Sequence, residues 1–148
     1  MTKSSTNITN DSKQLILDTH VLIWYMEGIK LSNKQVTLID KIREENNLYV
    51  SAISIWEISM LAKKDKIAFS ISLTEWIDNV LSMPGLNLID LSVAILMESC
   101  DLPNYKHKDP ADRFIIASNR SINAYLMTFD QKIIDYANQG YIRIVDES

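Results

Sequence analysis

The sequence is poor in the residues that cross-link a chain or carry it through a membrane. Its single cysteine, Cys100, excludes an intrachain disulfide and a thiolate zinc site, and it favours a reducing compartment. No apolar run approaches the roughly 18 residues that cross a bilayer. The first thirteen residues are polar and lack the apolar segment of a secretion signal. We therefore expect a flexible extension over residues 1–13 and a single cytoplasmic domain over residues 14–148.

Positive charge is also scarce. The chain has 15 Lys and Arg against 19 Asp and Glu, and its net charge is −4. This balance excludes the global basic surface that drives nonspecific nucleic-acid binding through counterion release. A phosphate-bearing substrate would need local positive charge, which a bound metal ion could supply. The 47% hydrophobic content is ordinary for one globular domain with a sizeable core.

Short apolar runs alternate with amphipathic segments along the chain. Strands are expected at 14–17, 48–50, 86–89, 124–128 and 141–145. Helices are expected after Asp18, at 32–45, 54–64, 72–83, 92–100 and 109–121, and from Asp130 to Gly140. Such alternation implies crossover connections and a parallel sheet covered by helices on both faces, which is an α/β fold.

Acidic residues stand where these strands and helices begin or end. The stretches are Leu15-Ile-Leu-Asp18, Ser54-Ile-Trp-Glu57, Asp109-Pro-Ala-Asp112 and Thr128-Phe-Asp130. Asp18 and Asp130 fall at the carboxyl ends of strands, where open parallel sheets bind ligands, and the other acids fall in helix turns that can face the same edge. Clustered carboxylates repel one another unless they are protonated, paired with bases or bridged by a cation. Little base lies nearby in the sequence, so we favour a hard cation such as Mg²⁺ or Mn²⁺.

The same acids have a purely structural interpretation. Ser54-x-x-Glu57 and Asp109-x-x-Asp112 match the capping box, and Asp18 and Asp130 are acceptable N-caps. The occurrence of all four stretches in order, within an alternating β/α pattern, favours the metal site over caps alone.

Basic residues near the third acidic stretch are candidate phosphate ligands. Arg113 could hold a phosphate or pair with an acid, and its fork geometry suits both. Lys106, with His107 and Lys108, forms a short basic run that could clamp phosphate or lie on a solvated loop. His20 and His107 lack the paired spacing of a zinc site.

The chain also resembles the PIN-domain family, and within it the VapC-type toxins. The resemblance rests on four motifs, Leu17-Asp-Thr-His20, Val50-Ser-Ala-Ile-Ser-Ile-Trp-Glu57, Asp109-Pro-Ala-Asp-Arg113 and Met127-Thr-Phe-Asp130, and extends from about residue 15 to 145. It implies a three-layer α/β/α sandwich around a parallel sheet and a Mg²⁺- or Mn²⁺-dependent endoribonuclease that acts as the toxin of a type II toxin–antitoxin pair.

The resemblance also implies roles for individual residues and for partners. Asp18, Glu57, Asp112 and Asp130 would be the catalytic and metal-binding acids, while Asp109 would be a helix cap that reaches the metal through water. An antitoxin would pack its C-terminal segment into a groove near the acids. Surface aromatics such as Trp24 or Tyr25 could anchor contacts with a partner, since aromatic residues are enriched at interfaces. Homodimerisation through helices is expected as well.

The expected reaction is in-line hydrolysis of an RNA phosphodiester with one or two metal ions, with Arg113 or Lys106 steadying the strand. Two alternatives remain open. One is a noncatalytic RNA-binding or scaffold module that uses the acids as caps. The other is an aspartyl-phosphate phosphatase, which usually has a second aspartate at the position of His20.

Overall fold

The structure, a computed structural model, describes residues 5–6 and 13–145. The extension expected over residues 1–13 therefore lies almost wholly outside the described residues. Its described part, β1 (Ser5–Thr6), pairs in parallel with β6 (Arg143–Val145).

Within residues 5–6 and 13–145, six parallel strands form one sheet in the order β1-β6-β5-β2-β3-β4. Besides β1 and β6, these are β2 (Leu15–Leu17), β3 (Leu48–Ser51), the edge strand β4 (Leu86–Ile89) and β5 (Tyr125–Met127). The chain builds outward from β2 to β4 and then crosses back to place β5 on the other side of β2. The direction of strand order therefore reverses between β2 and β5, and a crevice opens at such a point beyond the carboxyl ends of the strands.

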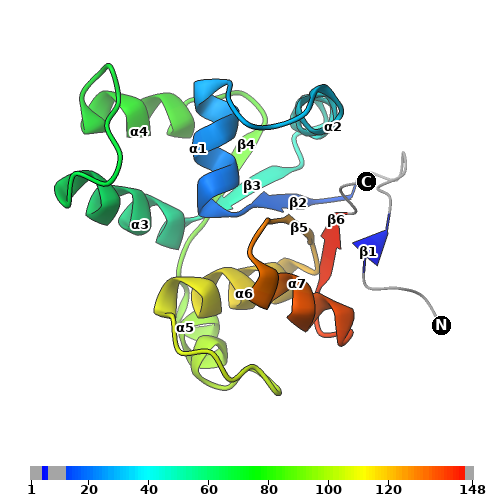
Figure 1. Ribbon diagram of the computed structural model, residues 1–148. Coiled ribbons are helices and arrows are strands. Elements are labelled where there is room, and N and C mark those ends of the chain that lie inside the picture. The colour runs from blue at the N-terminus through cyan, green and yellow to red at the C-terminus, as the bar shows by residue number, and fades with distance from the viewer. Residues whose placement is uncertain (1–4, 7–12, 146–148) are drawn as a thin grey trace.

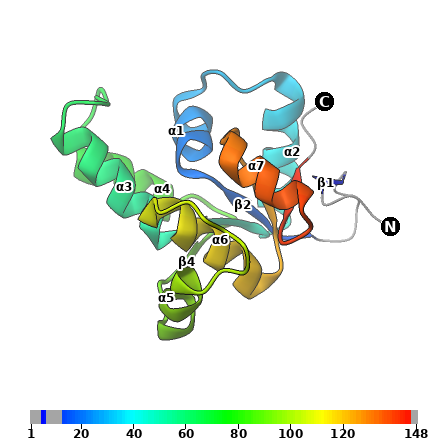
Figure 2. The same cartoon turned by 60° about the horizontal axis from the view of Figure 1, so that its bottom comes forward.

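Helices cover both faces of the sheet. They are α1 (Thr19–Glu27), α2 (Asn33–Glu44), α3 (Ala52–Lys63), α4 (Leu73–Leu81), α5 (Val93–Cys100), α6 (Pro110–Ile122) and α7 (Gln131–Asn138). Figure 1 shows α1, α2 and α4 above the sheet and α5, α6 and α7 below it. With the lower face turned forward in Figure 2, α6 lies between α5 and α7. Within the described ranges, no helix is long and apolar enough to span a membrane.

The strand β2 divides the hydrophobic core into two layers. Leu15 and Leu17 pack with Val21, Ile39 and other residues of the upper helices, whereas Ile16 packs with residues of α5, α6 and α7. Successive side chains of a strand point to opposite faces, so a fully apolar run is expected where both faces are covered. The predicted α/β sandwich around a parallel sheet is confirmed, and every strand and helix expected from the sequence is present.

One helix boundary was predicted wrongly. Helix α3 begins at Ala52, two residues before the expected start, because Ser51 caps it by accepting a hydrogen bond from the Ile53 amide. Ser54 is buried inside the helix, where its hydroxyl bonds to that of Thr19 at 2.9 Å. Glu57 consequently lies in the second turn, and the capping box expected from Ser54 and Glu57 does not form.

Two glycines with left-handed backbones differ in what surrounds them. A Cβ atom added to Gly85, at φ +85°, would lie 1.9 Å from the carbonyl oxygen of Arg43, whereas one added to Gly28, at φ +68°, meets nothing within 4 Å. Substitution at Gly28 therefore adds backbone strain alone, whereas substitution at Gly85 adds a backbone clash.

We expect Gly28→Ala to cost about 1 kcal/mol in unfolding free energy and Gly85→Ala more than about 3 kcal/mol. Urea unfolding of the two variants measures the difference. Equal losses would show that the close approach of Gly85 to Arg43 does not matter to stability.

Candidate active site

A pocket of about 320 Å³ opens at the sheet edge where the strand order reverses. It is lined by Asp18, His20, Val21, Trp24, Glu57, Asp109, Asp112, Phe129 and Asp130. All five acids selected from the sequence line this one cavity, which we call the acidic pocket. They come from four segments that are remote from one another in the chain.

Asp18 and Asp130 lie side by side because they follow adjacent strands. Leu17 of β2 is in register with Met127 of β5, and the Asp18 amide donates to the Met127 carbonyl at 3.0 Å. Each aspartate is an N-cap, Asp18 for α1 and Asp130 for α7. The capping interpretation is therefore correct for both, and it does not exclude their facing a common pocket.

Both carboxyl oxygens of Asp18 accept hydrogen bonds. Oδ1 accepts from the Thr19 amide at 2.8 Å, and Oδ2 accepts from the Thr128 hydroxyl at 2.6 Å. Thr128 in turn accepts from the Asp130 amide at 3.0 Å, so one hydroxyl ties the two aspartate segments together. Burial raises the pKa of Asp18, the bonds from Thr128 and Thr19 oppose the shift, and the charge of Asp130 adds to it.

Glu57 is carried into the pocket by the second turn of α3. Burial raises the pKa of its carboxyl group, and the nearby charge of Asp18 raises it further. Glu57 caps no helix, so the capping interpretation gives no reason for an acid at this position.

Asp109 and Asp112 belong to the start of α6. Asp109 is the N-cap and accepts from the Ala111 amide at 3.0 Å. Asp112 does not complete a capping box: its Oδ2 is buried without a hydrogen-bond partner among the described residues. Burial, followed by the charges of Asp109 and Asp130, raises the pKa of Asp112 to about 7. Asp112 is thus the acid that the fold compensates least.

A basic residue does lie near these acids, contrary to the expectation from the sequence. The Lys132 ammonium is 3.5 Å from Asp112 Oδ2 and 3.3 Å from Asp130 Oδ2. The charges of Asp112 and Asp130 raise the pKa of Lys132, which keeps it cationic. Lys132 therefore supplies part of the positive charge that the sequence argument assigned to a metal ion.

The carboxylate side chains of the pocket are the right type of ligand for a hard divalent cation, but they are not gathered around a single point. Carboxylate oxygens are the ligands that Mg²⁺ and Mn²⁺ prefer, and Asp112 has an oxygen without a hydrogen-bond donor. Within the residues that the structure describes, no three acidic, histidine or cysteine side chains are gathered tightly enough to form a ready ligand set. An ion shared by these acids would need them closer together, and the Lys132 ammonium lies against two of the oxygens that would hold it.

The two candidate phosphate ligands have different surroundings. Arg113 donates to the backbone carbonyls of Ser99, Tyr105 and His107, so its guanidinium fastens the loop before α6. Lys106 is exposed on that loop and makes no hydrogen bond or ion pair within the described part of the chain. The structure thus gives Arg113 a structural use, while substrate binding by either residue stays a prediction.

Sequence reasoning missed Thr128 and Lys132. The Thr128-Phe-Asp130 stretch drew attention to its aspartate, although a hydroxyl two residues before an N-cap was a usable signal. Lys132 lies two residues beyond Asp130, within the first turn of α7, but its reach across to Asp112 of α6 depends on tertiary structure.

Comparison with known proteins places these observations in a family. The sequence model of the PIN domain family matches residues 15–139. The chain is 27% identical over 120 residues to a protein of Mycobacterium tuberculosis named Ribonuclease VapC22, covering 80% of this chain and 88% of that protein.

Two solved complexes have the same fold. A chain of the DNA-bound VapBC2 complex from Rickettsia felis aligns with a TM-score of 0.66 at 16% identity, over 88% of this chain and 96% of that one. A chain of a toxin–antitoxin complex from Klebsiella pneumoniae aligns with a TM-score of 0.59 at 20% identity, over 91% and 98%.

The raised pKa of Asp112 predicts how stability depends on pH. A carboxyl group whose pKa rises on folding stabilises the protein below its unfolded pKa, and this stability is lost as pH rises through the folded pKa. The loss should therefore occur between about pH 4 and pH 7 in the wild type, and be absent in Asp112→Asn. Without divalent metal, we expect Asp112→Asn to gain about 1–2 kcal/mol relative to wild type between pH 5 and pH 8. Urea unfolding with chelator measures this gain; a difference independent of pH, as we expect for the control Asp101→Asn, would contradict the assignment.

The contacts of Lys132 predict a competition with metal. Lys132→Gln should lower the melting temperature at pH 8 in chelator by about 2–4 °C, because Asp112 and Asp130 lose a compensating charge. Added Mn²⁺ should raise the melting temperature of this variant more than that of wild type, because the ion no longer displaces an ammonium group. Lys64→Gln, at the exposed end of α3, is the control. If Mn²⁺ stabilised the wild type and Lys132→Gln equally, Lys132 would not occupy the place of the ion.

Proposed function

Since the chain belongs to the PIN-domain family, we propose that it is a Mg²⁺- or Mn²⁺-dependent endoribonuclease and the toxin of a type II toxin–antitoxin pair. The observation that carries this proposal is the convergence of five carboxyl side chains from remote segments on one pocket. The pocket lies at the reversal of strand order, where ligand sites of open α/β sheets occur.

The distribution of caps among the acids favours catalysis over a scaffold role. Asp18, Asp109 and Asp130 each cap a helix, which a noncatalytic fold would also need. Glu57 and Asp112 cap nothing, are half-buried or buried, and have raised pKa values. Groups with perturbed pKa values in a cleft are candidates for function because a fold without a use for them would gain by losing them.

The reaction that suits this pocket is hydrolysis of an RNA phosphodiester. A divalent ion held by Asp18, Glu57, Asp112 and Asp130 would polarise a phosphoryl oxygen and lower the pKa of the attacking water. Thr19 and Thr128 fix the orientation of Asp18, and each Asp18 oxygen retains a lone pair beyond those bonds. Asp109 is held as the cap of α6 and borders the same cavity, where it suits contact with a bound water.

An antitoxin partner belongs to this proposal. The M. tuberculosis relative is named a ribonuclease, and the structural neighbours come from toxin–antitoxin complexes. Trp24 and Phe129 line the acidic pocket with their rings 5.4 Å apart, and Phe129 is 44% exposed. These rings form an aromatic wall on which a segment of an antitoxin could pack, since aromatic residues are enriched at interfaces. Tyr25 is a weaker anchor because its hydroxyl is already bonded to Asp40 and Arg43.

A homodimer and a cytoplasmic location complete the proposal. Helix α5 presents Val93 and Met97 with 71% and 68% of their surfaces exposed, and these residues are available for contact with a second copy.

Asp18→Asn is the direct test of the catalytic assignment. It keeps the shape of the side chain and removes its charge, so we expect RNA cleavage in Mg²⁺ or Mn²⁺ to fall by at least about 100-fold. Single-turnover cleavage of labelled RNA measures the rate, with Asp101→Asn, at the exposed C-cap of α5, as the matched control. Induced expression should arrest growth for wild type and not for Asp18→Asn. Cleavage by Asp18→Asn at the wild-type rate would refute the proposal.

A further inference from the structure

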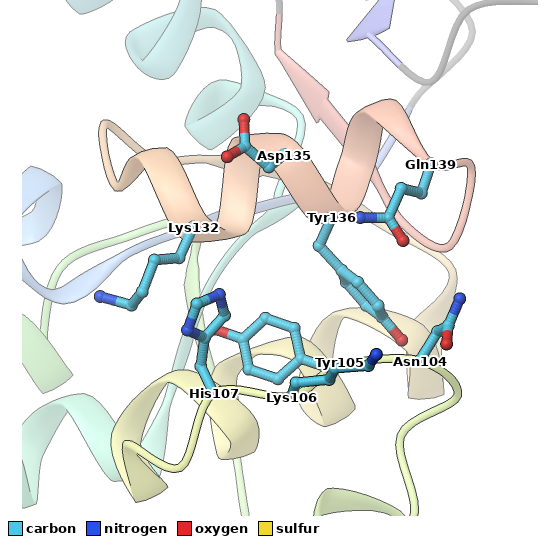
Figure 3. A pocket seen from close by; sticks show the side chains of 8 residues that line it. All are labelled: Asn104, Tyr105, Lys106, His107, Lys132, Asp135, Tyr136 and Gln139. Carbon is cyan, nitrogen blue, oxygen red and sulfur yellow. The ribbon is translucent and has the colours of Figure 1, made fainter.

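A second pocket lies beside the acidic one and is lined by more basic than acidic side chains. It has a volume of about 320 Å³ and lies between the loop that carries Lys106 and His107 and helix α7, which carries Lys132 and is capped by Gln139. Figure 3 shows the loop residues on one side and the α7 residues on the other, with the Gln139 side chain directed toward the loop. We call it the α7 pocket.

Lys132 joins the two pockets. Its side chain lines the α7 pocket, and its ammonium pairs with Asp112 and Asp130, which line the acidic pocket. A ligand that filled both pockets would pass directly over Lys132. An extended polyanion with one unit at the acids would place the next unit against Lys106 and His107.

The loop of the α7 pocket is fixed far more firmly than a connecting segment requires. Arg113 binds the Tyr105 and His107 carbonyls at 3.0 and 2.7 Å, and the Tyr136 hydroxyl donates to the Pro103 carbonyl at 2.6 Å. The Tyr105 ring packs edge-on against the rings of His107 and Tyr136. These contacts use the Tyr136 hydroxyl, the aromatic rings and the loop backbone, and they leave the side-chain nitrogens of Lys106 and Gln139 without a partner among the described residues.

Some polar side chains of the pocket are already bonded: Asp135 accepts from Gln131, and Lys132 pairs with two acids of the acidic pocket. Lys106 and Gln139 differ from these. The Lys106 ammonium and the Gln139 amide make no hydrogen bond or ion pair to any residue that the structure describes, and His107 makes only its ring contact. The lining holds two lysines and one histidine against a single acid, Asp135, whose carboxylate points away from the loop in Figure 3. In a chain with a net charge of −4, two lysines beside the acids are a local source of positive charge.

From this geometry we propose that the α7 pocket is a subsite for the RNA backbone, in which Lys106, His107 and Lys132 hold the phosphate next to the one at the acids. The Gln139 amide supplies a donor and an acceptor for the attached sugar or base. This inference rests on the proposed ribonuclease function and adds where the strand runs. Arg113 acts as a positioning residue that holds the loop in place.

RNA binding by paired variants tests the subsite. The probe is a fluorescein-labelled 12-nucleotide single-stranded RNA of mixed sequence, and binding is followed by anisotropy in Mg²⁺ with the uncleaving Asp18→Asn chain as background. Lys106→Gln should weaken binding about fivefold at 100 mM salt and reduce the slope of log K against log salt by about 0.7. Lys108→Gln, two residues along the same loop and outside the pocket lining, should change both values little.

A second pair of variants adds negative charge instead of removing positive charge. Gln139→Glu places a carboxylate in the pocket and should weaken binding more than tenfold, whereas Asn138→Asp makes the same charge change on the adjacent exposed residue of α7 and should not. Unchanged melting temperatures would show that all four variants fold. Equal effects within both pairs would overturn the subsite. If the wild-type protein did not cleave RNA, the ribonuclease proposal would be refuted, whereas the result on RNA binding would still hold.

Discussion

The structure depends on one geometric constraint, the shared edge of a parallel sheet. A helix that connects two parallel strands runs antiparallel to both of them. Such a helix therefore begins at the edge of the sheet where the strands end, which is the carboxyl edge. The starts of α1, α3, α6 and α7 therefore meet there. Orphan amides at helix starts recruit aspartate caps, and three such caps, Asp18, Asp109 and Asp130, accumulate negative charge at this edge. The amides at each helix start stabilise the charge of the aspartate that caps that helix. They do not relieve the repulsion among the acids, which increases when Glu57 and Asp112 are included.

The remaining repulsion is distributed unevenly. Asp18 accepts two hydrogen bonds, whereas Asp112 Oδ2 has no donor and only the ion pair with Lys132. A buried acid without donors is destabilising, so an acid kept at such a position is a candidate functional group. Under the proposed function, an ion at these acids would take over the charge compensation that Lys132 gives to Asp112 and Asp130.

The sequence was sufficient to predict the fold and the five acids that line the acidic pocket. It was insufficient to predict the contacts that these acids make. The apolar runs predicted the strands because a strand that is buried on both faces is apolar at every position. Asp18 and Asp130 were selected as site residues because they follow the ends of strands. The start of α3 was wrong because Ser51 and Ser54 are both acceptable caps, and only the end of β3 decides between them. Lys132 was overlooked because it is near Asp130 in sequence but meets Asp112 through the packing of α7 beside α6. The structural role of Arg113 could not be foreseen, since its three acceptors are backbone carbonyls of a loop without a pattern.

The proposed subsite suggests how an acidic chain could bind a polyanion, because the acidic pocket adjoins a pocket with two lysines. Global attraction is absent at a net charge of −4, so binding has to come from a few well-placed cations and would depend only weakly on long-range steering. Arg113 contributes through its hydrogen bonds to the loop backbone, because a loop that is already fixed adds no backbone-ordering cost when Lys106 and His107 bind a ligand. Lys132 lies between the acids and these cations. A ligand bound in the α7 pocket would therefore change how much positive charge reaches the acidic pocket. A ligand that draws Lys132 toward the α7 pocket thereby uncovers Asp112 and Asp130, so binding of anion and of metal should favour each other.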